Sequence, residues 1–369
     1  MGGEASDEFE LFIQVFQGTG MGPTPWDLFF EDVKLPIRNS GFEELIFADD
    51  LISCRVYLGN SQNSTIRKHA NKCQQEVHTW GRANRVTFDP GKEFFSIISN
   101  HDAEGPDFKI LGMWFDTSLS MKRVVNELCQ KVNWKLISLF RASRFFNVQA
   151  LVTQFKARIL GYIEYRTPAV YHANATTLTQ IDKLFEKFLR GIGLTKIEAL
   201  RDYNLAPLNS RRDIAMLGAI HRAVLGQGPE QLRKYFILVE GRHPTGRNSL
   251  RRHGQQIATF RSGTFLETTT HSILGLVDIY NLLPPAMVDT DNVHTFQAKL
   301  QALMKAQTAT NGEWELMLSP RLPLHSHPLR RLMNGVNSSN LGPENEVVAP
   351  VYDGLVTNQL TEDKPPAWW

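Results

Sequence analysis

The sequence Leu45-Ile46-Phe47-Ala48-Asp49-Asp50-Leu51-Ile52 places two adjacent carboxylates between two apolar runs. A turn signal, Asn39-Ser40-Gly41, comes shortly before it. Apolar runs on both sides of a short polar tip are typical of two strands joined by a tight turn. We therefore predict a β-hairpin in which Asp49 and Asp50 lie at the tip.

The chemistry of this tip depends on its two negative charges. Adjacent carboxylates repel each other, so holding them together costs free energy unless a cation binds between them. Mg²⁺ takes oxygen ligands and binds through one or two carboxylates together with substrate phosphates. The tip therefore predicts a metal site for phosphoryl transfer. The alternative is a solvated turn with two Asp residues, and four residues alone do not decide between these readings.

Length and composition set the broad class. The chain has 369 residues, enough for about two domains with hydrophobic cores. No apolar run approaches the roughly 18 residues of a membrane span, so we expect no membrane contact. Residues 1–10 lack the features of a signal peptide, and the three cysteines lack the spacing of metal ligands or disulfides. We therefore expect an intracellular protein, of the nucleus or the cytoplasm, that is not secreted.

Charge is distributed unevenly along the chain. Net charge is −8 over residues 1–120, +15 over residues 121–261 and −5 over residues 262–369. A carboxylate pair in an acidic segment that precedes a strongly basic one favours a metal site beside a polyanion. The alternative is that the basic side chains only solvate helix faces, but a block of this size favours nucleic acid as the partner.

The first part of the chain begins with a strand and a bend. Residues 11–16 are predicted to form a strand that leads into the glycine-rich bend Gln17-Gly18-Thr19-Gly20-Met21-Gly22-Pro23. Such a bend lets a backbone approach a ligand closely, and the N-terminus of the next helix offers N–H groups to phosphate. An ordinary strand-to-helix turn is the alternative. An amphipathic helix follows, with its apolar face at Trp26, Phe29, Phe30 and Val33.

Beyond the acidic hairpin the pattern continues to mix helix and strand. Residues 61–82 are predicted to be helical, and residues 85–88 and 94–99 to be strands. Lys92 lies in the turn between these strands, where its ammonium group would face either a phosphate or solvent. Residues 108–115 are predicted to form another strand, with Gly112 at a point where a second backbone comes close.

From about residue 121 the pattern changes to helices. Apolar faces recur with helical spacing over residues 124–139, 151–162 and 178–189, and a fourth helix is predicted over residues 211–225. The other faces carry basic residues that suit contacts with a nucleic-acid backbone. These residues are Lys131, Lys135, Lys156, Arg158, Lys183, Lys187 and Arg190.

The C-terminal part gives weaker signals. Residues 226–318 are predicted to form a loosely packed helical extension, and residues 319–369, rich in Pro, Ser, Asn and Gly, to be a disordered tail. The whole pattern predicts an α+β chain. Its first part, residues 1–118, combines an antiparallel sheet with packed helices, and residues 119–225 form a basic helical domain.

The order of these segments resembles the reverse transcriptases of non-LTR (LINE-like) retrotransposons, from the middle of the palm through the thumb. The similarity extends over about residues 11–300. It implies that residues 1–118 are part of a palm and residues 119–225 a thumb-like domain. It also implies an RNA-directed DNA polymerase with Mg²⁺ or Mn²⁺ as cofactor, acting on an RNA template, a DNA primer and deoxynucleoside triphosphates.

The resemblance also implies roles for single residues. Phe47-Ala48-Asp49-Asp50 is similar to the family's aromatic-Ala-Asp-Asp motif, which binds catalytic metal, and Gln17-Gly18 to its Pro-Gln-Gly segment beside the incoming nucleotide. Lys92 resembles the lysine that helps to protonate the leaving pyrophosphate, and Leu111-Gly112 resembles the primer-grip hairpin. Tyr280-Asn281-Leu282-Leu283-Pro284 is similar to a Trp-Asn-x-Leu-Pro element near the end of such reading frames.

The sequence departs from the family pattern in several places. Phe16 stands where Pro is usual and Pro25 where Leu is common, which weakens the match at the nucleotide pocket. The family takes a third carboxylate from a strand tens of residues before the Gln-Gly segment, whereas only 16 residues precede Gln17, and the fingers are missing. Two-metal transfer needs ions about 4 Å apart, which two adjacent Asp residues cannot both hold. We therefore expect a truncated reverse-transcriptase polypeptide that is inactive alone.

Two alternatives stay open at this point. One is a non-catalytic nucleic-acid-binding protein derived from a reverse transcriptase, which would use only the basic helices. The other is a non-functional relic, because a palm without its first strands would expose sheet edges. The sequence gives no indication of the oligomeric state.

Overall fold

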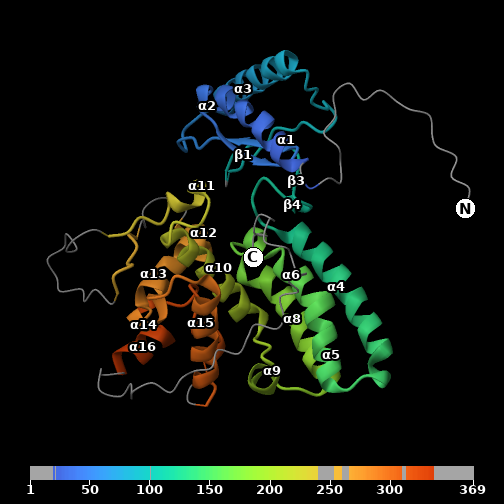
Figure 1. The fold of residues 1–369 in the computed structure, drawn as a ribbon, viewed down its shortest axis with the longest axis vertical. Coiled ribbons are helices and arrows are strands. Elements are labelled where there is room, and N and C mark those ends of the chain that lie inside the picture. The colour runs from blue at the N-terminus through green and yellow to red at the C-terminus, as the bar shows by residue number, and fades with distance from the viewer. Residues whose placement is uncertain are drawn as a thin grey trace, which may run out of the picture. The chain divides into compact units, whose positions relative to one another are not determined.

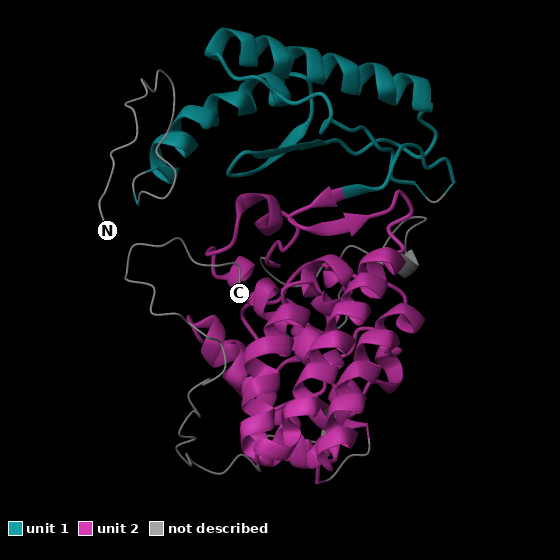
Figure 2. Ribbon diagram, turned by 90° about the vertical axis from the view of Figure 1, so that its right-hand side faces the viewer, with its two compact units in different colours: residues 1–108 teal, residues 109–369 magenta. Residues whose placement is uncertain are grey.

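The computed structural model describes residues 20, 22–99, 101–239, 253–259, 266–309 and 313–335. They belong to two compact units, one within residues 1–108 and the other within residues 109–369 (Figure 2). The division therefore falls inside the segment 108–115, and the boundary that we predicted after residue 118 is placed too late.

The first unit contains a β-hairpin and helices on both sides of it in the sequence. In chain order these elements are α1 (Pro23–Phe30), the 3-10 helix η1 (Glu31–Val33), α2 (Lys34–Asn39), β1 (Glu43–Phe47), β2 (Asp50–Cys54) and α3 (Asn63–Asn84) (Figure 1). The antiparallel register pairs Phe47 with Asp50 and Ile46 with Leu51, which leaves Ala48 and Asp49 as a two-residue turn. The hairpin predicted from the sequence is confirmed.

Apolar side chains of α1, η1, α2 and α3 form the core of this unit. Phe30, Val33 and Ile37 are buried together with Cys73 and Val77 of α3. The predicted strands at residues 85–88 and 94–99 are wrong. Within the described residues, these two segments form no strand. Their one sheet-like backbone pairing there is an isolated antiparallel bridge between Ile97 and Glu104.

A second, shorter hairpin follows. Its strands are β3 (Phe108–Ile110) and β4 (Met113–Phe115), so the single strand predicted over this segment is wrong. The chain reverses at Leu111 and Gly112, whose φ angles are 46° and 80°. A Cβ atom on Gly112 would meet nothing within 4 Å, so this glycine serves the turn rather than the close approach of a second backbone.

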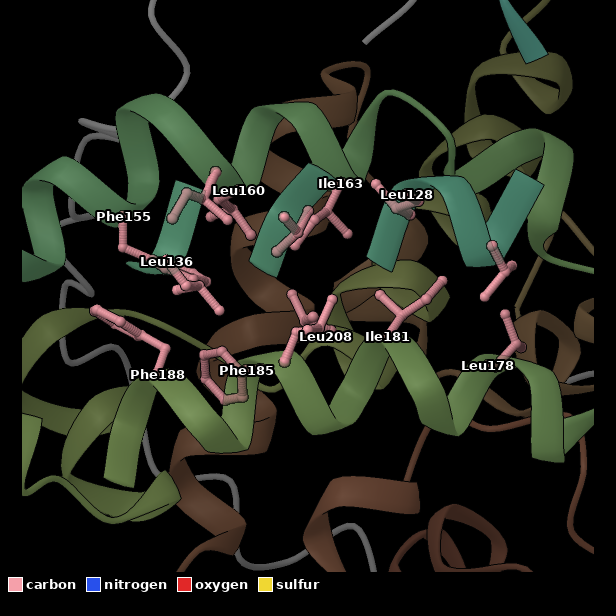
Figure 3. Close-up of a cluster of buried hydrophobic side chains, with 14 of the residues drawn as sticks. Leu128, Leu136, Phe155, Leu160, Ile163, Leu178, Ile181, Phe185, Phe188 and Leu208 are labelled. Atoms are coloured by element: carbon pink, nitrogen blue, oxygen red, sulfur yellow. The ribbon is translucent and has the colours of Figure 1, made fainter. Parts of the chain in front are cut away.

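The other regular elements described in the second unit are helices. Its first part contains α4 (Lys122–Ala142), η2 (Ser143–Phe145), α5 (Val148–Phe155), the π-helix η3 (Lys156–Leu160), α6 (Gly161–Glu164), α7 (Thr167–Val170) and α8 (Ala175–Ile192). The three predicted apolar faces meet in one core, in which Leu128 and Leu136 of α4 and Phe155 of α5 face Ile181 and Phe185 of α8 (Figure 3). These predicted faces are confirmed.

The remaining described helices follow in the chain, and most of them contribute to a second core that includes α10. They are α9 (Lys196–Tyr203), α10 (Leu208–Val224), α11 (Glu230–Arg233), α12 (Leu266–His271), η4 (Ile273–Gly275), α13 (Leu276–Leu282), α14 (Pro285–Val288), α15 (Val293–Gln307), η5 (Trp314–Leu316), η6 (Leu324–Ser326) and α16 (Pro328–Gly335). Helix α10 confirms the fourth predicted helix, and it packs against α13 and α15.

This second core corrects two expectations. The extension is not loosely packed where it is described, because Tyr280, Phe296 and Leu300 are fully buried. The tail does not begin at residue 319, because Leu329 is fully buried in the same core and His327 is buried beside it. Residues 336–369 lie outside the described part of the chain.

The described residues form a mixture of helices with two small antiparallel sheets, which is compatible with the predicted α+β class. Within the described residues, no helix combines the length and the apolar character needed to cross a membrane.

Candidate functional site

The acidic turn presents two neighbouring carboxylates to solvent. Asp49 is the second residue of the turn and Asp50 is the first residue of β2, and both side chains are exposed. Ala48 has a φ angle of 54°, in the left-handed region that residues with a side chain rarely occupy. A turn held in this conformation needs support from its surroundings, and the structure supplies it at both ends of the hairpin.

At the tip, Trp26 of α1 holds the turn. Its indole Nε1 donates a hydrogen bond of 2.9 Å to the carbonyl oxygen of Ala48. The indole ring is itself fixed, because it stacks on Phe30 with a centroid separation of 5.0 Å, and Phe30 contacts Trp80 of α3 edge-on. The aromatic face of α1 therefore positions the turn that carries the carboxylates.

At its base, an ion pair holds the hairpin. Glu44 of β1 is buried and accepts hydrogen bonds from Arg38 of α2, at 3.0 Å from Nε and 2.5 Å from Nη2. The bond to the Arg38 guanidinium is the main cause that lowers the pKa of Glu44, against the opposing effect of burial. A buried carboxylate with this partner stays ionised and ties β1 to α2.

The other candidates of the first unit are not brought to the acidic turn. Lys92 is exposed, and its Nζ lies 3.8 Å from the Asp89 carboxylate in its own turn. Among the described residues no hydrogen bond or ion pair joins Lys92 to Asp49 or Asp50. Gln17 and Gly18 lie outside the described residues.

The donor chemistry of the turn fits one hard divalent cation. Carboxylate oxygens are the ligands that Mg²⁺ and Mn²⁺ prefer, and an exposed pair leaves room for water to complete the coordination shell. In the part of the chain that the structure describes, no group of three or more His, Cys, Asp or Glu side chains is arranged to hold a metal ion. The turn therefore offers two protein ligands, Asp49 and Asp50.

Most of the predicted basic residues lie on the surface of the helical unit. Lys131 and Lys135 of α4, Arg158 of η3, and Lys183 and Lys187 of α8 are exposed. Lys187 donates a hydrogen bond of 2.9 Å to Asn133 of α4, and the Lys135 ammonium lies 5.2 Å from the ring centre of Tyr162. These side chains are accessible to a ligand, as the sequence predicted for a polyanion-binding face.

Lys156 is the exception, and its predicted role on the outer surface is wrong. Its ammonium is half-buried and donates a hydrogen bond of 2.7 Å to the carbonyl oxygen of Tyr203, at the end of α9. Burial lowers the pKa of Lys156, and the nearby charge of Arg211 lowers it further. Lys156 holds helices together, as cations at helix C-termini commonly do.

The hairpin with Leu111 and Gly112 is fixed by a contact within its unit. The hydroxyl of Tyr165 donates a hydrogen bond of 3.1 Å to the carbonyl oxygen of Leu111. The Arg123 guanidinium lies 3.6 Å from the ring centre of Trp114 in β4. The hairpin shape fits the one implied by the resemblance, while its contact with a primer stays a prediction.

The segment Tyr280-Asn281-Leu282-Leu283-Pro284 has a structural role. Tyr280 is fully buried, and its hydroxyl lies 2.9 Å from Nδ1 of His221. Asn281 accepts a hydrogen bond from the backbone N–H of Ile257 and donates one to the carbonyl of the same residue, at 2.9 and 2.8 Å. The side-chain amide of Asn281 thus acts like one position of a β-ladder.

Sequence reasoning missed the role of Trp26. Its place on an apolar helix face indicated a core residue, and the ring does pack there. The only signal for the additional role is the chemistry of indole, whose N–H needs an acceptor when the ring is partly buried. The acceptor, Ala48, lies 22 residues away in the sequence.

Comparison with known proteins gives a partial match. The chain is 26% identical over 149 residues to a protein of Bradysia coprophila described as "Retrovirus-related Pol polyprotein from type-1 retrotransposable element R1". The matched region is 40% of this chain but only 13% of that polyprotein, so the chain spans a small part of the relative's length. No family model and no solved structure matches the chain. The identity supports a retrotransposon-derived relationship for this chain.

Proposed function

We propose that the chain is the palm-to-thumb part of a non-LTR retrotransposon reverse transcriptase, in which Asp49 and Asp50 bind a divalent metal and the basic helices bind nucleic acid. The observation that carries the proposal is the acidic turn, because a two-residue connection presents both carboxylates at the tip of an anchored hairpin. The partial identity to a retrotransposon Pol polyprotein supports it.

The residues of the first unit would act by positioning. When bound, Mg²⁺ or Mn²⁺ polarises phosphate oxygens as a Lewis acid. Asp49 and Asp50 are the side chains that would hold the ion, and the contacts of Trp26 and Glu44 keep their backbone in place. Lys92 remains a candidate proton donor to pyrophosphate, and Gln17 and Gly18 remain candidate contacts of the nucleotide.

The second unit would hold the primer and template through their backbones. Lys131, Lys135, Arg158, Lys183 and Lys187 are exposed cations on a helical scaffold with its own core. Cations on rigid helices suit phosphate contacts, which bind all sequences alike. We therefore expect salt-dependent binding of an RNA template, a DNA primer and their hybrid.

The same geometry argues against efficient synthesis by this chain alone. Two-metal transfer needs two ions about 4 Å apart, and one adjacent carboxylate pair does not provide for both. Catalysis of phosphoryl transfer is mainly electrostatic and geometric, so a single weakly held ion supplies little of it. We propose that the chain binds nucleic acid and metal but does not extend a primer efficiently by itself.

Two measurements on the full chain test this proposal. Mn²⁺ binding, followed by electron paramagnetic resonance, is expected to be weak and to be lost in Asp49→Ala and in Asp50→Ala. Asp27→Ala, which removes an exposed carboxylate from α1, is the matched control and should keep Mn²⁺ binding. Primer extension on an RNA template with Mg²⁺ or Mn²⁺ should give little product.

Three outcomes would contradict it. Mn²⁺ binding that is unchanged in both Asp variants would remove the metal site. Robust synthesis that disappears in Asp49→Ala would refute the inactivity. Failure of the chain to bind any nucleic acid at low salt would refute the proposed polymerase-derived function. A cooperative thermal transition is the control that shows that the chain is folded in this measurement.

A second candidate function follows from the division into two units. The cations and their core lie in the unit within residues 109–369, whereas the acidic turn lies in the other. A non-catalytic nucleic-acid-binding protein would need only the helical unit. Such a protein would bind nucleic acid with the same affinity in the presence and absence of Mg²⁺, and Asp49→Ala would not change that affinity. The polymerase-derived site instead predicts that Mg²⁺ increases the affinity and that Asp49→Ala abolishes the increase.

A further inference from the structure

Two large aromatic side chains lie exposed along α4 and the short helix that follows it. Trp134 is 71% exposed and Phe145 is 72% exposed. Aromatic rings of this size are more often buried or placed at an interface, so this exposure needs an explanation. Figure 1 shows α4 as an outer helix of the second unit.

Cations flank these rings in the sequence. Residues 122–146 contain six Lys or Arg residues and one acidic residue, Glu127, and all six basic side chains are exposed. Among the described residues, no carboxylate lies within 4.0 Å of Lys131 or Arg141. The Arg144 guanidinium lies 4.7 Å from the ring centre of Phe145. A surface with this charge favours a negatively charged partner.

Helix geometry aligns Lys131, Trp134 and Arg141 along α4, and Arg144 and Phe145 follow them in η2. Trp134 follows Lys131 by three positions and precedes Arg141 by seven, spacings that put the three on the same side of an α-helix. From Trp134 to Phe145 the chain advances about 17 Å at helical rises of roughly 1.5–2 Å per residue. We call Lys131, Trp134, Arg141, Arg144 and Phe145 the α4 stripe.

We infer that the α4 stripe binds single-stranded nucleic acid, with unpaired bases stacked on Trp134 and Phe145 and with phosphates contacted by Lys131, Arg141 and Arg144. The inference rests on the proposed function and assigns the single-stranded part of its ligand to this face. Aromatic platforms in a cationic track bind unpaired bases without sequence preference. A duplex keeps its base faces stacked on one another, so flat rings at the surface gain nothing from it.

The charge of the α4 stripe also favours a nucleic acid over a protein as its partner. The buried centres of protein–protein interfaces are depleted of charged residues, whereas here three cations are interspersed with the two rings. A polyanion with flat apolar bases satisfies both kinds of side chain at once.

Replacing one ring in two different ways tests the inference. In the full chain, Trp134→Leu keeps an apolar side chain but removes the ring, and we expect it to weaken binding of a labelled single-stranded oligonucleotide about tenfold. Trp134→Phe keeps a ring and should stay within about threefold of the unmodified chain. Tyr235→Leu removes an exposed aromatic beside Lys234, outside the stripe, and should leave binding unchanged.

Charge is tested separately. For single strands, each lost phosphate contact should reduce the slope of log affinity against log salt by about 0.7. We expect this reduction in Lys131→Gln and Arg141→Gln, while Arg330→Gln, an exposed cation of α16, should keep the slope. Trp134→Leu should lower affinity at every salt concentration with no change of slope.

An abasic oligomer of the same length is the decisive probe. It keeps the phosphates and lacks the bases, so it should bind the unmodified chain about as weakly as the base-bearing strand binds Trp134→Leu. Equal binding of both oligomers, or binding that Trp134→Leu does not alter, would overturn the inference while leaving the proposed function intact. If the true partner of the stripe were an acidic protein, the two oligomers would likewise bind equally, because the bases would add nothing. Absence of all nucleic-acid binding would instead refute the proposed function.

Discussion

The indole Nε1 of Trp26 donates a hydrogen bond of 2.9 Å to the carbonyl oxygen of Ala48, and this bond joins the first helix to the acidic turn. Trp26→Phe keeps an aromatic ring and removes the donor. We expect a loss of about 1 kcal/mol in the free energy of unfolding. Faster hydrogen exchange at Asp49 and Asp50 and weaker Mn²⁺ binding should accompany it.

Trp80→Phe is the control for this prediction, because Trp80 packs in the same aromatic cluster and, among the described residues, no hydrogen bond joins its side chain to the turn. It should affect thermal stability but not Mn²⁺ affinity. Equal effects of the two variants on metal binding would show that ring packing, and not the hydrogen bond, positions the carboxylates.

The Arg38–Glu44 pair makes a prediction for the base of the hairpin. Arg38→Met should cost about 1–3 kcal/mol, because it leaves the buried Glu44 carboxylate without its charged partner. Lys92→Met is the control, since the exposed Lys92–Asp89 pair lies within one turn of the same unit and should be worth less than about 1 kcal/mol. Urea denaturation of both variants measures the difference.

The same pair predicts an effect of acid. The pKa of Glu44 is lower in the folded chain than in the unfolded chain, so its contribution to stability is complete above the unfolded pKa near 4.5 and is lost as the pH falls through the folded value. Arg38→Met should therefore lose less stability than the unmodified chain on acidification from pH 5 to pH 3. A parallel decline of the two proteins would contradict this assignment.

Asp213 predicts the opposite dependence of stability on pH. Burial raises its pKa to about 7, and Tyr171 donates a hydrogen bond of 2.6 Å to its carboxyl group. Between pH 4 and pH 7 the folded chain therefore keeps a proton that the unfolded chain releases, and stability falls as the pH rises, by on the order of 1 kcal/mol per pH unit. Asp213→Asn should remove this slope.

Comparison of Tm at pH 5 and pH 7 measures the effect. The buried His221, His253 and His327 have lowered pKa values and destabilise the fold on acidification, but they are present in both proteins and cancel in the comparison. Asp202→Asn, at an exposed position, is the control and should keep the pH dependence of the unmodified chain. An unchanged slope in Asp213→Asn would mean that Asp213 is ionised in the folded chain.

Asn281 predicts a large effect from one side chain. Asn281→Ala removes both hydrogen bonds to the backbone of Ile257, which is buried in the second core, and should cost about 2 kcal/mol. Asn126→Ala, on the exposed side of α4, should change the free energy of unfolding by less than about 0.5 kcal/mol. Thermal melts followed by circular dichroism distinguish the two results.

Local signals in the sequence were sufficient for the acidic hairpin and for the first helices of the second unit. The hairpin needs only apolar strands and a short tip, and both are contiguous in the sequence. The faces of α4 and α8 follow a helical period, which predicts burial without knowledge of the partner helix. These are the elements whose structure depends on neighbours within a few residues.

The failures share one physical cause, which is pairing of backbone and side-chain groups that the periodicity of the sequence does not reveal. The strand expected at residues 94–99 has a suitable composition, but a strand forms only where a partner backbone lies beside it. The sequence around Lys156 indicates a surface cation, whereas in the structure its ammonium donates a hydrogen bond to the carbonyl oxygen of Tyr203, 47 residues away. In the polar segment after residue 319, His327 is buried with both ring nitrogens paired, because its Nε2 donates to the carbonyl oxygen of Ser319 and its Nδ1 accepts from the backbone N–H of Leu329.

The π-helix η3 has a consequence for how the helical unit tolerates change in length. A π turn holds one residue more than the α-helical turn it replaces. Deleting one residue within 156–160 should convert η3 to regular α-helix while Phe155 and Ile163 keep their directions toward the core that they share. The same deletion in the middle of α4 would rotate everything beyond it by about 100°. Natural variants of this chain that are shorter by one residue should therefore have lost it here.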